Sequence, residues 1–203
     1  MTKRRTLTPA QQERLIYFDR EFVAGRYEIE TGEPASTQIS KAQGGKAGAN
    51  FLAFAADVSA TETRSFPVST LQMLATVLPA IEKSVELDPE QFKSGMPSMT
   101  GWVEGELTVM TAQGKKLDGT PTTELYSGFR IHGGPSPALN LSLITVPTYF
   151  TSGIDALTRM QQTVLAEMSI PTRAFVRVLA TRSHFEMMWI AVPYVMLESH
   201  GPT

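Results

Sequence analysis

The sequence lacks cysteine altogether, and this absence excludes several kinds of chemistry. A chain of 203 residues without a thiol has no disulfide framework, no thiolate zinc site, no iron–sulfur cluster and no cysteine nucleophile. Long hydrophobic runs are also missing, because Pro193 interrupts the most apolar stretch, which is far shorter than the roughly 20 residues of a membrane span. The basic N-terminus has no apolar segment like that of a signal peptide. We therefore expect a cytoplasmic protein that does not bind membranes.

Neither sign of charge dominates the chain. It carries 18 Lys and Arg against 20 Asp and Glu, a net charge of −2, which argues against bulk electrostatic attraction to nucleic acid. The total conceals a split, because residues 1–26 hold six basic and three acidic residues, whereas the remainder holds twelve basic and seventeen acidic. Such asymmetry fits either a local nucleic-acid site or a head-to-tail protein interface between a basic and an acidic patch.

With 42% hydrophobic and 19% charged residues, the composition is that of a globular protein rather than a disordered one. Three segments have the periodicity of helices. Thr8 has the features of an N-cap with Pro9 at the first helical position, and apolar residues recur at helical spacing up to Ala24. Similar stripes predict helices near residues 69–85 and 153–168, and Pro79 should bend or end the first of these two near Leu78.

Alternating apolar and polar residues predict strands at 26–30, 102–112, 124–132, 139–146, 174–182 and 185–197. Residues 51–58 are apolar enough for a buried strand, and their alanine content also allows a helix. We therefore expect an α+β protein with a single domain. Its antiparallel or mixed sheet has about six or seven strands and is packed by about three helices. A flexible N-terminal arm (1–8), a polar Gly/Ser loop (35–50) and a frayed C-terminal tail (198–203) complete the expected organisation.

The catalytic motifs that the sequence suggests are incomplete. The glycine-rich segment 44–48 resembles a phosphate-binding loop, but Ser40 and Ala47 occupy positions that such a loop reserves for Gly and for Ser or Thr. Two glutamate pairs, Glu28 with Glu30 and Glu104 with Glu106, stand at strand spacing and could share one face. Exposed strand faces are usually just solvated, so we predict no catalytic residue, no metal site and no cofactor.

Among the three histidines, none has a second histidine or an acid at metal-ligand spacing. His132 is the best candidate for a general base. An enzyme with a dispersed site built from Glu104, Glu106 and His132 is therefore the third hypothesis for this chain, and it requires these side chains to converge in one pocket. No small-molecule substrate is inferred.

The leading hypothesis is a non-catalytic intracellular protein that binds a protein partner or itself through its surfaces. Its motivation is the absence of a reactive constellation, the charge asymmetry, and the apolar segment 185–192 that contains Met187 and Trp189. If this segment is an edge strand, it is the natural oligomer interface, and if it is central, it belongs to the core of the sheet.

The second hypothesis is a nucleic-acid-binding accessory or regulatory protein. The basic residues of the N-terminal arm and of the polar loop would contribute, together with two arginines spaced to share one face of a strand. These candidate contacts for nucleic acid or a partner are Lys3, Arg4, Arg5, Arg14, Lys41, Lys46, Arg173 and Arg177.

Overall fold

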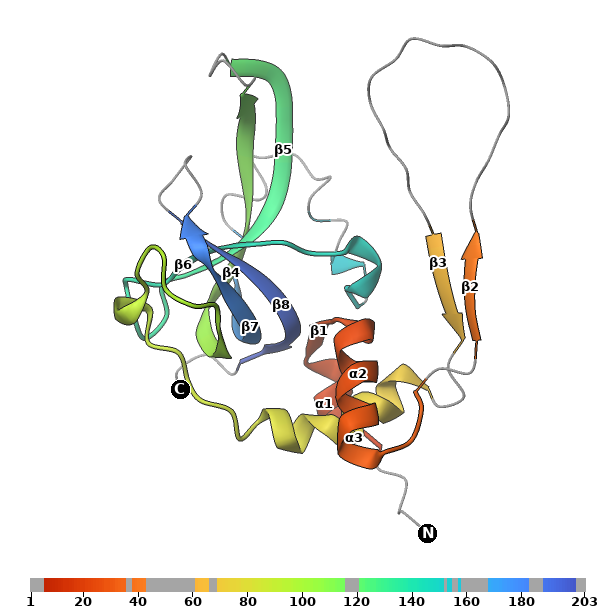
Figure 1. Cartoon of the computed structure of the whole chain (residues 1–203). Coiled ribbons are helices and arrows are strands. Elements are labelled where there is room, and N and C mark those ends of the chain that lie inside the picture. Colours follow the sequence, from red (N-terminus) through yellow and green to blue (C-terminus); the bar gives the residue numbers. More distant parts are fainter. Residues whose placement is uncertain are drawn as a thin grey trace, which may run out of the picture.

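The structure is a computed structural model that describes residues 6–35, 38–42, 61–65, 69–115, 121–151, 153–154, 157, 168–182 and 188–199 (Figure 1). Its elements are, in chain order, α1 (Pro9–Glu13), β1 (Leu15–Phe18), α2 (Arg20–Thr31), β2 (Gln38–Ala42), β3 (Thr61–Ser65), α3 (Thr70–Ile81), the 3₁₀ turn η1 (Pro89–Gln91), β4 (Met99–Lys115), β5 (Pro121–His132), β6 (Asn140–Leu143), the 3₁₀ turn η2 (Pro147–Tyr149), β7 (Ile170–Arg182) and β8 (Trp189–Glu198).

The prediction of one N-terminal helix over residues 9–24 is wrong after Glu13, where α1 ends. Thr8 does cap α1, and its side chain accepts a hydrogen bond from the amide of Gln11. The chain then forms β1, which pairs antiparallel with β8, and Asp19 caps a new helix through the amides of Glu21 and Phe22. All four residues of β1 are buried, and burial on both faces favours a strand over a short amphipathic helix.

Two further predictions are wrong in the region after β1. The predicted strand 26–30 lies within α2, so Glu28 and Glu30 belong to a helix and do not share one strand face. Glu28 accepts a hydrogen bond from the amide of Ala35, and Glu30 forms an ion pair with Arg26 at 2.9 Å. The segment 35–50, expected to be a loop, contains β2, which pairs antiparallel with β3 as a separate two-stranded sheet.

The helix α3 confirms the periodic stripe of its sequence but not the predicted effect of Pro79. The helix continues to Ile81, and the amide of Glu82 still donates to the carbonyl of Leu78 at 2.8 Å. Pro79 has no amide proton to donate to the i−4 carbonyl, so the helix gives up one hydrogen bond there but continues for two more residues. The expected helix at 153–168 and the strand at 51–58 lie largely or wholly outside the described residues.

The main sheet has six strands in the order β1-β8-β6-β5-β4-β7, and β7 also pairs with β8. This additional pairing closes β4, β5, β6, β8 and β7 into a barrel, to which β1 adds at β8 (Figure 1). The pair β6–β8 is parallel, whereas the other pairs in the barrel are antiparallel. The α+β class is therefore confirmed, and the mixed sheet curls into a partly closed barrel.

The long strand β4 joins the two halves of the barrel. Its first part, from Met99 to Leu107, pairs with β7, and its second part, from Glu106 to Lys115, pairs with β5. Gly105 lies at this changeover, and a Cβ there would lie 2.8–3.0 Å from atoms of Leu139, His132 and Ile131. Glycine is therefore required for the close approach of β5 and the following turn to β4.

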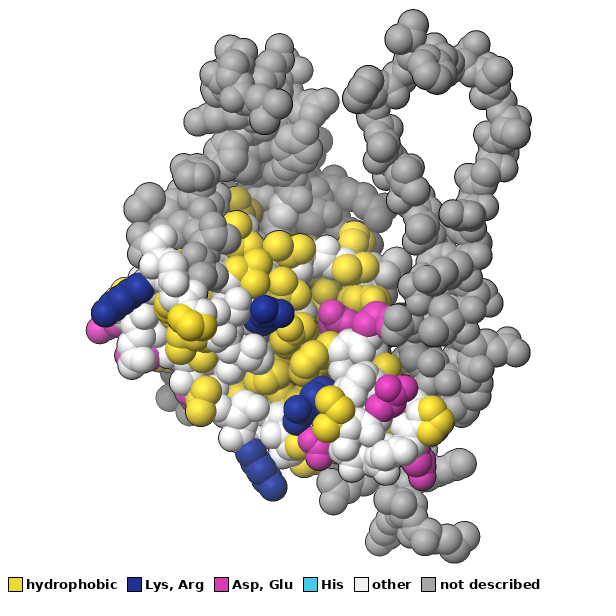
Figure 2. Space-filling view, in the orientation of Figure 1, with side chains coloured by type: hydrophobic (Ala, Val, Ile, Leu, Met, Phe, Trp, Pro, Cys, Tyr) yellow, Lys and Arg dark blue, Asp and Glu magenta, His cyan; other side chains and the backbone are white. Residues whose placement is uncertain are grey.

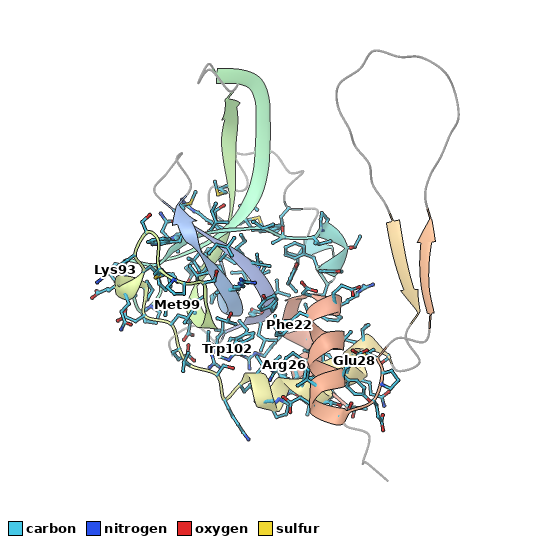
Figure 3. The ribbon with its side chains drawn as sticks, in the orientation of Figure 1. Phe22, Arg26, Glu28, Lys93, Met99 and Trp102 are labelled. Atoms are coloured by element: carbon cyan, nitrogen blue, oxygen red, sulfur yellow. The ribbon has the colours of Figure 1, made fainter. Side chains whose placement is uncertain are left out.

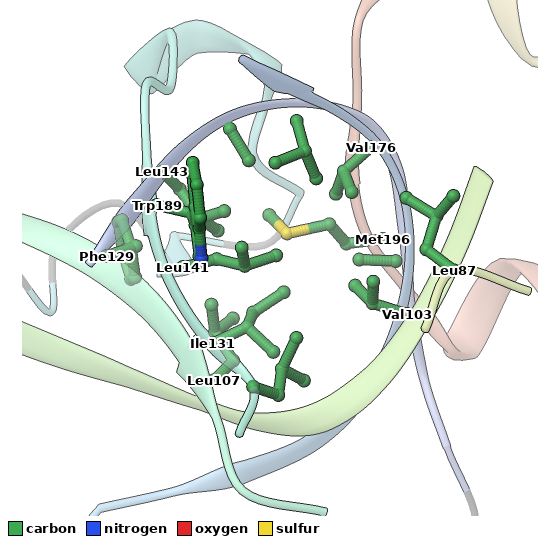
Figure 4. Close-up of a cluster of buried hydrophobic side chains, with 14 of the residues drawn as sticks. Leu87, Val103, Leu107, Phe129, Ile131, Leu141, Leu143, Val176, Trp189 and Met196 are labelled. Atoms are coloured by element: carbon green, nitrogen blue, oxygen red, sulfur yellow. The ribbon is translucent and has the colours of Figure 1, made fainter. Parts of the chain in front are cut away.

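The apolar side chains form two cores. The first fills the barrel with residues such as Leu107, Phe129, Ile131 and Leu141 (Figure 4). The second lies between the outside of the barrel and the helices α2 and α3, and it contains Trp102 (Figure 3). The helices thus cover one outer region of the barrel. Within the described residues, no helix is long and apolar enough to cross a membrane.

Candidate functional site

The outer face of β4, β5 and β6 is a polar surface beside the apolar core of the barrel. Residues such as Leu107, Phe129 and Leu141 point into the barrel, so their neighbours along each strand point outward. Cross-strand pairing arranges six of these outward side chains in two rows, and all six are half-buried. The rows are Thr108, Arg130 and Ser142, called the donor row below, and Glu106, His132 and Asn140, called the acceptor row.

The donor row consists of two hydroxyls on either side of a guanidinium. Arg130 of β5 pairs in register with Thr108 of β4 and with Ser142 of β6. The Arg130 Nε donates a hydrogen bond to the Thr108 Oγ1 at 3.1 Å, which links these two side chains of the row. Guanidinium N–H and hydroxyl O–H groups are donors suited to an anion such as phosphate.

The acceptor row lies next to the donor row on the same strands. His132 pairs in register with Glu106 and with Asn140. The Glu106 Oε2 and the Asn140 Oδ1 are both shielded from solvent and have no donor within the described part of the chain. Partial burial lowers the pKa of His132 from its usual 6.5, the Arg130 charge lowers it further, and Glu106 opposes both. His132 is therefore neutral at pH 7.

The turn between β5 and β6 fixes the position of the acceptor row. Gly133 and Gly134 both have left-handed backbone, with φ of 66° and 74°. A Cβ on Gly134 would lie 2.6 Å from the carbonyl oxygen of Glu104 and 2.8 Å from the Cα of Gly105. The turn thus packs directly on the backbone of β4, one residue before Glu106.

The proposed enzyme site does not converge in one pocket. Glu106 and His132 are neighbours, but Glu104 lines a separate pocket of about 370 Å³ together with Glu86 and Ser136. Neither Glu106 nor His132 lines that pocket. Within the described residues, no three His, Asp or Glu side chains gather in a way that could hold a metal ion.

The arginines of β7 share one face, but the structure gives them different surroundings. Ala174 and Val176 point into the barrel, so Arg173 and Arg177 point outward. Arg173 forms an ion pair with Glu86, and its guanidinium carbon lies 4.5 Å from the centre of the Trp102 ring. These contacts commit Arg173 to the fold, whereas Arg177 is exposed.

The other predicted basic contacts are dispersed or lie outside the described residues. Arg14 donates from Nε to the carbonyl of Glu198 at 2.7 Å, which ties β1 to β8. Lys41 belongs to β2, but its side chain is not described, and Lys3, Arg4, Arg5 and Lys46 lie outside the described ranges. Figure 2 shows that Lys and Arg side chains on this face stand apart, around a hydrophobic area over β7 and β8.

Trp189 lies inside the barrel rather than on an interface. It is 4% exposed, and its ring meets that of Phe92 edge-on at 5.9 Å. Its strand β8 pairs with β1, β6 and β7, so the central-strand alternative of the sequence analysis is the one observed. The side chain is therefore not available to a second copy. Met187, the other expected interface residue, lies outside the described residues.

Sequence reasoning missed four members of the two rows, namely Thr108, Arg130, Asn140 and Ser142. Strand alternation could have marked each as outward-facing. Their alignment across three strands depends on register, which the local pattern does not contain.

Comparison with protein-family models, with curated proteins and with solved structures gives no match to this chain.

Proposed function

We propose that this chain is a non-catalytic protein that binds single-stranded nucleic acid on the outer face of β4, β5 and β6. The observation that carries the proposal is the connectivity of the barrel. The strands β4, β5 and β6 form a meander, β6 pairs in parallel with β8, and β7 closes the ring between β8 and β4. This connectivity resembles that of the OB-fold, the five-stranded barrel that binds oligonucleotides and oligosaccharides.

Connectivity alone does not determine a ligand, because one fold hosts several functions. The surface chemistry favours nucleic acid. In OB-fold barrels the ligand lies across the second and third strands, which correspond to β5 and β6. Those strands carry the donor and acceptor rows, and the second core and its helices lie against other strands, as Trp102 of β4, Phe175 of β7 and Val195 of β8 indicate.

The two connections that flank the ligand in OB-fold barrels also have basic residues here. In sequence, Lys115 and Lys116 stand where β4 gives way to the β4–β5 connection. Arg182 ends β7, where the β7–β8 connection begins. In sequence, the two connections therefore supply cations for a negatively charged backbone. We therefore propose Lys115, Lys116 and Arg182 as the main basic contacts to nucleic acid, in place of Arg14 and Arg173, which the fold already uses.

Fluorescence anisotropy with labelled oligonucleotides of about 25 nucleotides tests this proposal. Single-stranded DNA or RNA should bind more tightly than the corresponding duplex, and the affinity should fall between about 50 and 200 mM salt. No binding of any of the three at low salt would overturn the proposal.

A double variant, Lys115→Ala with Lys116→Ala, tests the location of the contacts. Each single-strand phosphate contact contributes about 0.7 to the slope of log affinity against log salt, so the slope should become shallower by about 1.4. The matched control is Lys83→Ala with Lys93→Ala, because both lysines are exposed and neither belongs to the strands that carry the two rows. This control changes the net charge equally and should leave the slope unchanged.

Protein binding, the first expectation from the sequence, remains a second candidate. Ile144 and Val146, just after β6, are 54% and 44% exposed, which is unusual for large apolar side chains close to each other in sequence. Light scattering tests self-association through this segment. A dimer or larger species that Ile144→Ser disrupts would support it, whereas a strict monomer at high concentration would count against it.

A further inference from the structure

The two polar rows differ in what they offer a ligand. The donor row presents a cation and two hydroxyls, and it suits a phosphate. The acceptor row presents two oxygens, Glu106 Oε2 and Asn140 Oδ1, that have no donor among the described residues although they are withdrawn from water. An acceptor left in this state is unfavourable, so the acceptor row suits a ligand group with N–H donors.

The spacing of the rows matches one nucleotide. Thr108 and Glu106 are two residues apart on β4, as are Arg130 and His132 on β5, so the rows are about 7 Å apart. A nucleotide that places its phosphate on the donor row directs its base across the adjacent strand positions. The acceptor row lies on this path, on the same face and on the same three strands.

We infer that the acceptor row recognises the exocyclic amino group of a base, so that the protein prefers cytosine and adenine to thymine. This inference rests on the proposed function. Cytosine presents its N4 amine and adenine its N6 amine, and Glu and Asn are the side chains that pair with these bases. Thymine has an oxygen in the place of the amine, which would face the Glu106 carboxylate without a proton between them.

The neutral His132 supports this discrimination. It stands between Glu106 and Asn140 and, as a neutral imidazole, it carries a single N–H donor. One donor cannot satisfy both flanking oxygens, so an acceptor remains for the ligand. All three side chains are only half-buried, but the two unpaired oxygens themselves are shielded, so water competes little for them.

Binding of labelled homopolymers, dC20 and dT20, measures the preference between two pyrimidines of equal length. We expect dC20 to bind about tenfold more tightly than dT20, the discrimination typical of one good contact to a base edge. Equal affinity of the wild-type protein for both would overturn the inference and leave the proposed function standing. No binding of either would overturn both.

Variants separate the roles of the two rows. Glu106→Gln should bring the dC20/dT20 affinity ratio close to one, and Asn140→Leu should lower it independently. Glu104→Gln is the matched control, because it makes the same charge change two residues away on β4 beside a different pocket, and the ratio should not change.

Arg130→Gln should weaken the binding of both homopolymers equally and reduce the salt slope by about 0.7, because it removes a phosphate contact but no base contact. The assignment of the rows would be contradicted by the opposite pattern. In that pattern the base preference is lost in Glu104→Gln or Arg130→Gln but is retained in both Glu106→Gln and Asn140→Leu.

Discussion

Two adjacent glycines in the β5–β6 turn provide a controlled test of the close packing beside the acceptor row. Gly133 and Gly134 have nearly the same left-handed backbone, with φ of 66° and 74°. A Cβ on Gly133 would meet nothing within 4 Å, whereas a Cβ on Gly134 would lie 2.6 Å from the carbonyl oxygen of Glu104. Replacing each by alanine therefore separates the backbone conformation from the steric contact.

The expected losses of stability follow from these two contributions. An alanine in the left-handed region costs about 1–2 kcal/mol, and the reduced freedom of the unfolded chain offsets about 0.4–1 kcal/mol of this. Gly133→Ala should therefore lower the free energy of unfolding by about 1 kcal/mol. Gly134→Ala has the same conformational cost, and it adds about 1–3 kcal/mol because the backbone of β4 must move away from the new methyl group.

Urea denaturation monitored by tryptophan fluorescence measures both variants against the wild-type protein. The Gly134→Ala midpoint should fall clearly below the Gly133→Ala midpoint, with the same dependence on denaturant in each. Equal losses in the two variants would refute the steric contact between the turn and β4. A larger loss in Gly133→Ala would contradict the described turn geometry itself.

Two further predictions concern a buried hydrogen bond and a titrating group. Trp102→Phe should lower the free energy of unfolding by about 2 kcal/mol, because it removes the buried hydrogen bond from the Trp102 Nε1 to the Ile81 carbonyl at 2.9 Å and replaces a fully buried indole by a smaller ring, although the Ile81 carbonyl keeps its bond from the Ser84 amide; a thermal melt like that of the wild-type protein would contradict this. The lowered pKa of His132 means that the folded protein binds a proton less readily than the unfolded chain. The contribution of His132 to stability should therefore level off above pH 6.5 and fall as the pH decreases from 6.5 through the folded-state pKa, and His132→Asn should remove this part of the decrease in urea midpoints measured between about pH 5 and pH 8.

The N-terminal region shows where local sequence patterns reach their limit. Thr8, Pro9 and Gln11 predict the start of a helix, and α1 begins there. The next apolar residues also fit a helical stripe, yet Leu15–Phe18 form β1, because pairing with β8 buries all four side chains. The partner strand lies some 180 positions later in the chain, with Leu15 opposite Leu197, and no local pattern contains that information.

The candidate site shows the same limit. Alternation located the strands that became β4 and β5 and placed Glu106 on their exposed face, whereas His132 stood out only as a candidate general base at a strand end. It could not show that these two are direct partners, or that Asn140 completes the row, because a register shift of one residue would separate them. Conversely, Arg173 looked available from its sequence, but Glu86 and Trp102 engage it through contacts far apart in the chain.

The net charge of −2 bears directly on how the proposed binding would work. Strongly basic proteins gain most of their affinity from displacing counterions, and they bind with little regard to base identity. In this chain 20 acidic residues outnumber 18 basic ones, and the fold already uses Arg14 and Arg173. A larger share of the affinity must then come from contacts to the bases. A shallow salt slope should therefore accompany a pronounced preference for cytosine over thymine, whereas a steep slope without such a preference would place the binding surface elsewhere than on the two rows.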